Sequence, residues 1–164
     1  MPVLTLMAAP YSFDWGAHIN AKLIANNQYG SSVESDVGNG AIIMTLPDAP
    51  VNLQEVVENR SATSITFTWE AGASNGGDVV IDYRISYAHE SNVYTVLAVG
   101  ITTLEYTATG LNAGLQYKFK VEARNYLYYS QPSNFVQILC ATIPSVPSIL
   151  STSNEADYIR VAWN

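Results

Sequence analysis

The feature that most constrains this chain is an internal repeat of about 97 residues. Residues 45–50 and residues 142–147 both read Thr-x-Pro-x-x-Pro, and the second copy starts 97 residues after the first. Each copy is followed by an alternating apolar segment that ends in tryptophan, at residues 65–69 and 159–163. A period of this length indicates that the chain is assembled from repeated structural units.

A second pair of segments repeats with an offset of 98. Residues 13–27 and 111–125 share a glycine, the same alternating apolar positions and a final Ala-x-Asn. We interpret the chain as one complete unit between two partial ones. The units expected are the C-terminal part of a first module at 1–46, a complete module at 47–143 and the opening strands of a third at 144–164.

The two partial units would not complete each other by strand exchange between chains. Joined end to end, they would still lack the equivalents of residues 71–98, which include a whole expected strand. Such an incomplete sandwich would leave sheet edges open. We therefore expect the chain to be a stretch of a longer polypeptide.

Within the complete unit, short alternating segments follow one another with polar turns between them. The alternation is clear at residues 65–69 and 117–123, which predicts strands with one buried face. The turn cluster at 74–78 contains two glycines, which permit positive φ. Segments with this pattern, expected to be strands, are 51–58, 64–70, 79–88, 93–99, 104–109, 115–125 and 134–142. About seven strands without helical periodicity predict an all-β, antiparallel sandwich.

The motifs of the complete unit resemble the fibronectin type III family. The residues that carry the resemblance are Pro47-x-x-Pro50, Trp69, the strand at 81–87, and Gly110-Leu111-x-x-Gly114-x-x-Tyr117 followed by Phe119, Val121, Ala123 and Asn125. The resemblance implies tandem β-sandwiches of about seven strands each, with Trp69, Tyr117, Pro50 and Pro147 in structural roles. It also implies a tyrosine corner, in which the Tyr117 hydroxyl bonds to backbone near Leu111.

Two positions depart from the family pattern. Ile19 stands where the complete unit has Tyr117, so the first unit lacks the corner hydrogen bond. Tyr128 stands where the first unit has Gly30. The wealth of Asn and Tyr, together with the phrase at residues 38–45, resembles module arrays in large surface proteins of ciliates and other protists.

The net charge of −7, with only seven scattered Lys and Arg residues, argues against nucleic-acid binding. No apolar run reaches the length needed to cross a membrane. The apolar start at residues 1–10 lacks a basic region and is too short for a secretory signal.

Residues with catalytic or metal-binding chemistry are few and isolated. His18 and His89 have no Cys or paired carboxylates at metal-ligand spacing, and the sequence has no nucleophile elbow or phosphate-binding glycine loop. Cys140 has no second cysteine for a disulfide, and we expect a half-buried strand thiol. We therefore predict no enzyme activity, cofactor or metal.

The best local candidate for binding a partner is the run Tyr126-Leu127-Tyr128-Tyr129. Tyrosine supplies a large contact area at low entropic cost, and loops at the ends of sandwiches are common binding sites. The alternative, which we favour, is that some of these rings cover the end of the sandwich or pack against the next module. No Arg-Gly-Asp motif or Trp-Ser-x-Trp-Ser box is present.

The joints between units are short and contain proline, which fixes φ and predicts limited bending. Asn59-Arg60-Ser61 is an N-glycosylation sequon, which favours a secreted location. We expect a structural or adhesive segment of a semi-rigid rod or filament, a glycoprotein at the cell surface or outside the cell, whose partners are other proteins or neighbouring copies. Two alternatives stay open: an intracellular cytoskeletal or ciliary scaffold array, and a receptor ectodomain that binds a protein ligand through residues 126–130.

Overall fold

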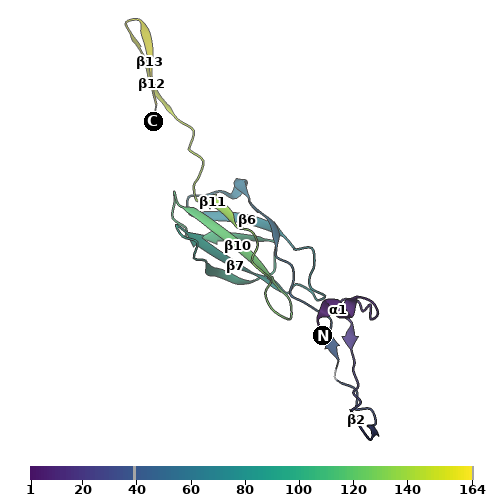
Figure 1. The fold of residues 1–164 in the computed structure, drawn as a ribbon. Helices are drawn as coiled ribbons and strands as arrows, with labels where there is room; N and C mark the ends of the chain where they lie inside the picture. The colour runs from purple at the N-terminus through teal and green to yellow at the C-terminus, as the bar shows by residue number, and fades with distance from the viewer. Residues whose placement is uncertain (39, 164) are drawn as a thin grey trace.

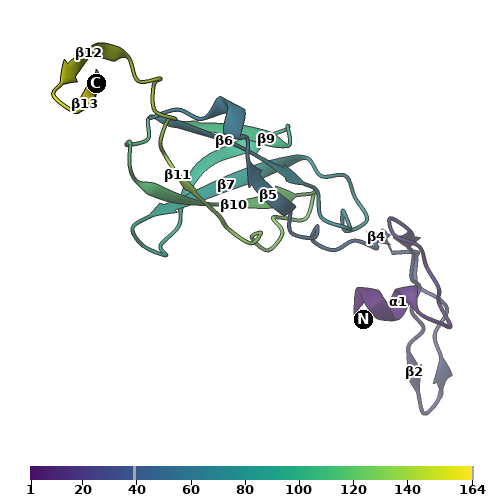
Figure 2. The same cartoon turned by 90° about the horizontal axis from the view of Figure 1, so that it is seen from above.

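The computed structural model describes residues 1–38 and 40–163. Asn39, part of the phrase at 38–45, and Asn164 lie outside the described residues. Figures 1 and 2 show one β-sandwich in the middle of the molecule, with the N-terminal segment at one end and a β-hairpin near the C-terminus at the other. The predicted all-β, antiparallel class is confirmed.

The sandwich consists of two antiparallel sheets formed by residues 51–139. One sheet has the order β5-β6-β9, and the other has the order β11-β10-β7-β8. The seven strands are β5 (Val51–Glu55), β6 (Ser64–Glu70), β7 (Asp82–His89), β8 (Thr95–Ile101), β9 (Glu105–Thr109), β10 (Gln116–Arg124) and β11 (Val136–Leu139). Each expected strand of the complete unit has a counterpart. The largest differences are three residues, at the start of β7 (82 instead of 79) and at the ends of β5 (55 instead of 58) and β11 (139 instead of 142).

The core lies between the inner faces of β6, β7 and β10. The alternating apolar residues of β6 and β10 are almost fully buried, as their period of two requires when one face of a strand is covered. Phe67 stacks on Phe119 with a distance of 4.6 Å between ring centroids, and Trp69 meets Tyr83 edge-on at 5.5 Å. These contacts join the two sheets, since each pair has one residue in each sheet.

A tyrosine forms a hydrogen bond at the end of the sandwich that lies away from the N-terminal segment. The Tyr117 hydroxyl accepts a hydrogen bond from the backbone N–H of Asn112 at 2.9 Å, which is the contact that the family resemblance implied next to Leu111. Tyr117 is 4% exposed, so the hydroxyl and the N–H satisfy each other away from bulk water.

The N-terminal segment contains a short helix and two small strand pairs. The helix α1 (Val3–Met7) has one turn and buries no residue, and the sequence showed no periodicity that predicted it. The strand β1 (His18–Ile19) pairs with β4 (Ala41–Ile42), and β2 (Asn26–Asn27) pairs with β3 (Gly30–Ser31). Together these strands form a long hairpin over residues 16–38 and 40–43, called the hairpin 16–43 below.

The hydrogen bonds in this hairpin match those of the β10–β11 hairpin, at positions that lie 98 residues earlier in the chain. Ser32 exchanges two hydrogen bonds with Ala25 on the opposite strand, and Ser35 exchanges two with Leu23. In the sandwich, the equivalent residues bond in the same way: Ser130 with Ala123, and Ser133 with Val121. The bridge between residues 26 and 31 likewise corresponds to the Arg124–Tyr129 bridge. The environment differs, because Leu23 is 75% exposed whereas Val121 is 0% exposed.

The C-terminal hairpin repeats the first two strands of the sandwich. β12 (Ile149–Glu155) pairs with β13 (Tyr158–Trp163), and the partners Ser151–Ala162 and Thr152–Val161 correspond to Gln54–Thr68 and Glu55–Phe67 of β5 and β6. A register shift precedes these pairs in both hairpins. The loop differs: β5 and β6 are separated by the 3₁₀ turn η1 (Val57–Asn59), whereas two residues join β12 to β13.

The expectation of several sandwiches in a row needs correction for this chain. Residues 51–139 form one sandwich, and each flanking segment forms a two-stranded hairpin. A lone hairpin has no second sheet on which to bury its apolar face, which explains why Ile159 is 68% exposed while its counterpart Ile65 is 1% exposed.

Candidate functional site

The candidate partner-binding loop follows β10 at the end of the sandwich where the chain enters from residue 50 (Figure 1). Asn125 sets its conformation: the side-chain oxygen accepts hydrogen bonds from the backbone N–H groups of Leu127, at 3.0 Å, and Tyr128. The Asn125 backbone N–H donates to the Tyr128 carbonyl at 3.2 Å. The loop is therefore a closed turn with a defined shape.

The four residues of this loop divide into two groups. Tyr126, Leu127 and Tyr128 are 78%, 45% and 64% exposed. The Tyr129 ring instead lies over the Arg84 guanidinium at 4.0 Å, with Arg124 at 5.4 Å from the same ring. Tyr129 thus packs on its own sheet. The other three side chains are largely exposed at the end of the sandwich, and the Tyr128 ring also meets the Tyr129 ring edge-on, with 5.6 Å between centroids.

The two arginines under Tyr129 are each held by a carboxylate on the neighbouring strand. Arg84 forms a bidentate pair with Glu122, at 2.8 and 2.6 Å, and Arg124 forms one with Asp82. These hydrogen bonds raise the pKa of both guanidinium groups above the ordinary value. The planar fork of arginine lets it bind a carboxylate at its edge while an aromatic ring covers its face.

The same outer face continues toward the other end of the sheet. Lys120 lies over the Tyr94 ring at 4.3 Å, and Lys118 lies over the Phe135 ring at 5.5 Å. Four of the seven Lys and Arg residues of the chain are therefore on this one sheet face. The scatter of basic residues along the sequence did not predict this grouping, because strand alternation places residues 118, 120 and 124 on the same side.

The candidate glycosylation site lies at the opposite end of the sandwich. Asn59 ends the turn η1 and is exposed. The backbone N–H groups of Asn59 and Arg60 donate to the Val56 and Val57 carbonyls, at 3.1 and 3.2 Å, and the Arg60 side chain pairs with Glu55 at 2.8 and 2.6 Å. The Asn59 side chain is therefore presented on an ordered, accessible turn.

Cys140 is more deeply buried than expected. It follows β11 directly, is 0% exposed, and its thiol lies 3.3 Å from the Ala62 carbonyl oxygen. Burial raises the pKa of the Cys140 thiol. The prediction of a half-buried thiol was wrong because the turn between β5 and β6 covers this position, which no local pattern indicates.

The two histidines lie apart. His18 is exposed on β1, and His89 ends β7 with its ring 5.5 Å from that of Tyr117. Its Nε2 atom is 3.9 Å from a Glu90 carboxylate oxygen, and its buried Nδ1 atom has no partner in the described part of the chain. No group of three or more metal-ligating side chains occurs within residues 1–38 and 40–163.

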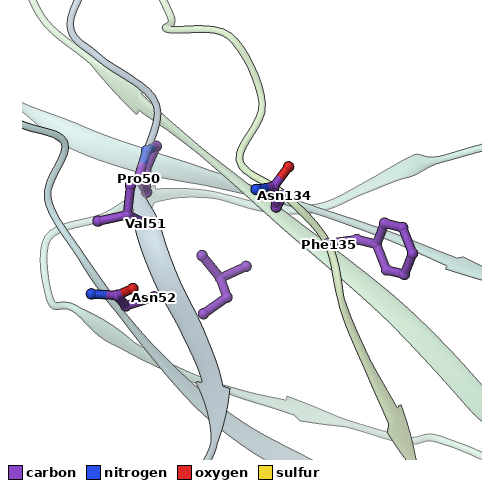
Figure 3. Close-up of a pocket in the computed structure, with 6 residues that line it drawn as sticks. Pro50, Val51, Asn52, Asn134 and Phe135 are labelled. Atoms are coloured by element: carbon purple, nitrogen blue, oxygen red, sulfur yellow. The ribbon is translucent and has the colours of Figure 1, made fainter.

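A groove runs between β5 and the start of β11 (Figure 3). It has a volume of about 350 Å³ and is lined by Pro50, Val51, Asn52, Leu53, Asn134 and Phe135. None of these side chains is titratable or nucleophilic. In Figure 3 the Phe135 ring points away from Asn52, in line with its contact to Lys118 on the outer sheet face. The groove offers shape and two carboxamides but no acid–base chemistry.

The remaining predicted residues lie in different settings. Trp69 is 3% exposed in the core, and its Nε1 atom has no partner among the described residues. Pro50 is buried at the start of β5, whereas Pro147 is exposed ahead of β12. Sequence reasoning missed Ser130 and Ser133, although the spacing Ser-x-x-Ser at 32–35 and 130–133 is a repeated signal. None of the described helices has the length and apolar character needed to span a membrane.

Comparison with known proteins agrees with this architecture. The chain is 28% identical over 134 residues to the Kelch domain-containing protein SSO1033 of Saccharolobus solfataricus, covering 82% of this chain and 17% of that protein. It is 27% identical over 152 residues to human Netrin receptor DCC, covering 87% and 10%, and 32% identical over 134 residues to human Brother of CDO, covering 79% and 11%. The chain thus spans less than a fifth of each relative.

Solved structures give the same result. Domains A168–A170 of titin match with a TM-score of 0.62 at 20% identity, covering 79% of this chain and 43% of that one, which shows the fold alone. The sixth fibronectin type III domain of human fibronectin type III domain containing protein 3 matches with a TM-score of 0.52 at 26% identity, covering 62% and 94%. The profile of the "Fibronectin type III domain" family matches residues 48–138, more than half of the chain. The chain belongs to the fibronectin type III domain family.

Proposed function

We propose that this chain is a non-catalytic stretch of a tandem array of fibronectin type III modules, and that the array acts as a semi-rigid rod at the cell surface. The observation that carries the proposal is the repetition of hydrogen bonds on both sides of the sandwich. Residues 16–43 reproduce the last hairpin of a module and residues 149–163 reproduce the first. In three consecutive modules, the middle one is preceded by the last hairpin of the first module and followed by the first hairpin of the third. The chain has its hairpins in this order.

The prolines at the joints support stiffness. Pro47 and Pro50 are buried against the complete module, and Pro144 and Pro147 stand at the matching positions of the next joint. Because proline fixes φ, each joint has fewer accessible conformations than a linker of glycine and serine. The segment between β11 and β12 contains only nine residues, 140–148, so little slack remains between modules.

The surface location rests on two observations. Several relatives are receptors by name, including Netrin receptor DCC and Receptor-type tyrosine-protein phosphatase F. The sequon at Asn59 lies on an exposed turn. The Titin of Drosophila melanogaster is also a relative, at 26% identity over 117 residues, and it keeps an intracellular cytoskeletal or ciliary scaffold as the alternative.

Antibody labelling of intact and permeabilised source cells tests the location, with an antibody raised against the folded chain. Labelling of intact cells is the expected result, and labelling only after permeabilisation would favour the scaffold. Small-angle scattering of the parent polypeptide tests the rod. Each module should lengthen the molecule by about 30 Å, the span of a nine-residue strand such as β10, whereas a compact parent contradicts the rod.

A second candidate function is recognition of a protein ligand through Tyr126, Leu127 and Tyr128. The observation in its favour is that these three side chains are exposed on a turn whose backbone is fixed by Asn125. A photo-crosslinking residue at position 128 should capture a partner in source cells. The control position is Ser91, which is exposed at the other end of β7. Equal capture at both positions would contradict a specific site.

A further inference from the structure

The segment that enters the sandwich is bound along a loop of that sandwich before β5 begins. The backbone N–H of Thr45 donates to the Gly76 carbonyl at 2.8 Å, and that of Asp48 donates to the Ser74 carbonyl at 2.9 Å. The Asp48 carboxylate accepts a hydrogen bond from the Ser74 N–H at 3.0 Å. Residues 45–48 and 74–76 thus form a short ladder of main-chain contacts.

Asn125 ties this ladder to the loop after β10. It is 1% exposed, and its side-chain NH₂ donates to the carbonyl oxygens of Thr45, at 2.7 Å, and Asn75, at 3.1 Å. Its oxygen accepts from the Leu127 N–H. One buried amide therefore joins the entering segment, the loop before β7 and the loop after β10.

Two glycines allow the close approach. Gly76 and Gly77 have φ angles of 75° and 89°, which side chains rarely adopt. A Cβ atom at Gly76 would collide with the Thr45 carbonyl oxygen, and one at Gly77 would lie 2.9 Å from the Ile43 carbonyl oxygen. The loop therefore fits the backbone of the entering segment only while both positions lack a side chain.

The preceding hairpin is fixed to the same contact. Ile43 is 1% exposed; its N–H donates to the Ala17 carbonyl and its carbonyl accepts from the Gly16 N–H, both at 2.9 Å. The Trp15 ring lies against Gly77. Between the hairpin and the sandwich, Ile43, Thr45 and Asp48 thus each form main-chain hydrogen bonds to other segments.

We propose that Asn125, Gly76 and Gly77 form a locking site for the joint between modules, and that its ligand is the backbone of residues 43–48, which are the last four residues of the preceding module and the first two of the complete one. The site holds the two modules at one angle and gives the array its stiffness. The inference depends on the proposed array in one respect, which is that the hairpin 16–43 belongs to a preceding module.

The chain also contains a second joint, which can be compared with the first. Residues 142–147 have the Thr-x-Pro-x-x-Pro pattern of 45–50, but Pro144 and Pro147 are exposed whereas Pro47 and Pro50 are buried. An equivalent of residues 74–77 would fall after Asn164, so this second segment has no locking loop within the chain. It therefore serves as a reference that has the proline pattern without the locking site.

Residual dipolar couplings on the whole 164-residue chain test the lock. Couplings of residues 41–48 should fit the alignment of the sandwich, whereas those of residues 144–163 should not. Hydrogen exchange at the Thr45 amide supplies a second measurement. Averaged couplings at 41–48 in the unmodified chain would overturn the proposal.

Asn125→Asp is the decisive variant, because it keeps the acceptor for Leu127 and replaces the donor to Thr45 with a second oxygen. Exchange of the Thr45 amide should accelerate about tenfold or more, the effect of losing ordinary hydrogen bonds that hold a local opening closed. Gly76→Ala should act in the same direction. Asn134→Asp, the same change at an exposed position, should leave couplings and exchange unchanged.

Near-ultraviolet circular dichroism of each variant checks that the sandwich is folded. Couplings and exchange in Asn125→Asp equal to those of Asn134→Asp would overturn the role of the amide. The array is judged separately, on the parent polypeptide. A rigid joint in this chain together with a compact parent polypeptide would contradict the proposed rod and still support the locking site.

Discussion

The Tyr117 hydroxyl and the Asn112 backbone N–H are 2.9 Å apart, and this hydrogen bond closes the end of the sandwich opposite to Asn125. Both groups lie beside the buried Leu111. A bond of this kind protects a main-chain donor that would otherwise need water. The hairpin 16–43, where Ile19 takes the place of tyrosine, has no hydroxyl for the same role.

Tyr117→Phe should destabilise the sandwich by about 1–2 kcal/mol, because it leaves the Asn112 N–H without its partner while keeping the ring. Urea unfolding followed by tryptophan fluorescence measures the change. Tyr87→Phe is the matched control on the same sheet, and its effect should stay within about 0.5 kcal/mol. Equal effects of the two variants would show that the hydrogen bond contributes nothing.

Phe67→Ala should cost about 3–5 kcal/mol, because it removes a 0%-exposed ring that stacks on Phe119 across the two sheets. Phe135→Ala serves as the control, since that ring is 52% exposed. Thermal unfolding of both variants should give a much larger loss for Phe67. A loss of similar size at Phe135 would place the stabilising core elsewhere.

Tyr129→Ala should destabilise the sandwich by about 1 kcal/mol, the contribution of a cation–π contact such as the one with Arg84. Tyr126→Ala removes a ring that is 78% exposed, and we expect less than about 0.5 kcal/mol. Urea unfolding distinguishes the two. Equal values would contradict the division of the loop into one packed residue and three largely exposed ones.

The sequence predicted the strands of the sandwich because apolar alternation at Ile65, Phe67 and Trp69, and again from Tyr117 to Ala123, follows directly from one-sided burial. The repeat also located both hairpins. Burial on the second face of a strand is not local information: Cys140 is covered by residues 61 and 62, which are 78 positions away or more.

The candidate loop was only partly predictable for the same reason. The run Tyr126-Leu127-Tyr128-Tyr129 reads as one cluster, yet Tyr129 is held by Arg84, which comes from a different strand. Some of these rings were expected from the sequence to pack on the protein, but the sequence did not indicate which ones. Asn125 was visible as the end of a repeated Ala-x-Asn motif, but its contact with Thr45 joins residues 80 positions apart.

Cys140 should react slowly with thiol reagents in the native protein and fast in guanidinium chloride, because the thiol is buried and its pKa is raised. The unfolded thiol ionises at the lower, ordinary pKa. Stability is therefore unaffected below that value and is lost as pH rises above it. Urea midpoints across this range measure the loss, and Cys140→Ala should remove this part of the dependence. An unchanged slope in the variant would assign it to other groups.

Asn59 should carry an N-linked glycan when the chain is expressed through a eukaryotic secretory pathway. The sequon is Asn59-Arg60-Ser61, and it begins on an exposed turn that is closed by backbone hydrogen bonds from Asn59 to Val56 and from Arg60 to Val57. Mass spectrometry before and after glycosidase treatment should show the added mass on one peptide. Asn59→Gln should abolish it, and Asn134→Gln, which changes an exposed asparagine outside a sequon, should not. An unmodified Asn59 in secreted protein would remove this support for a surface location.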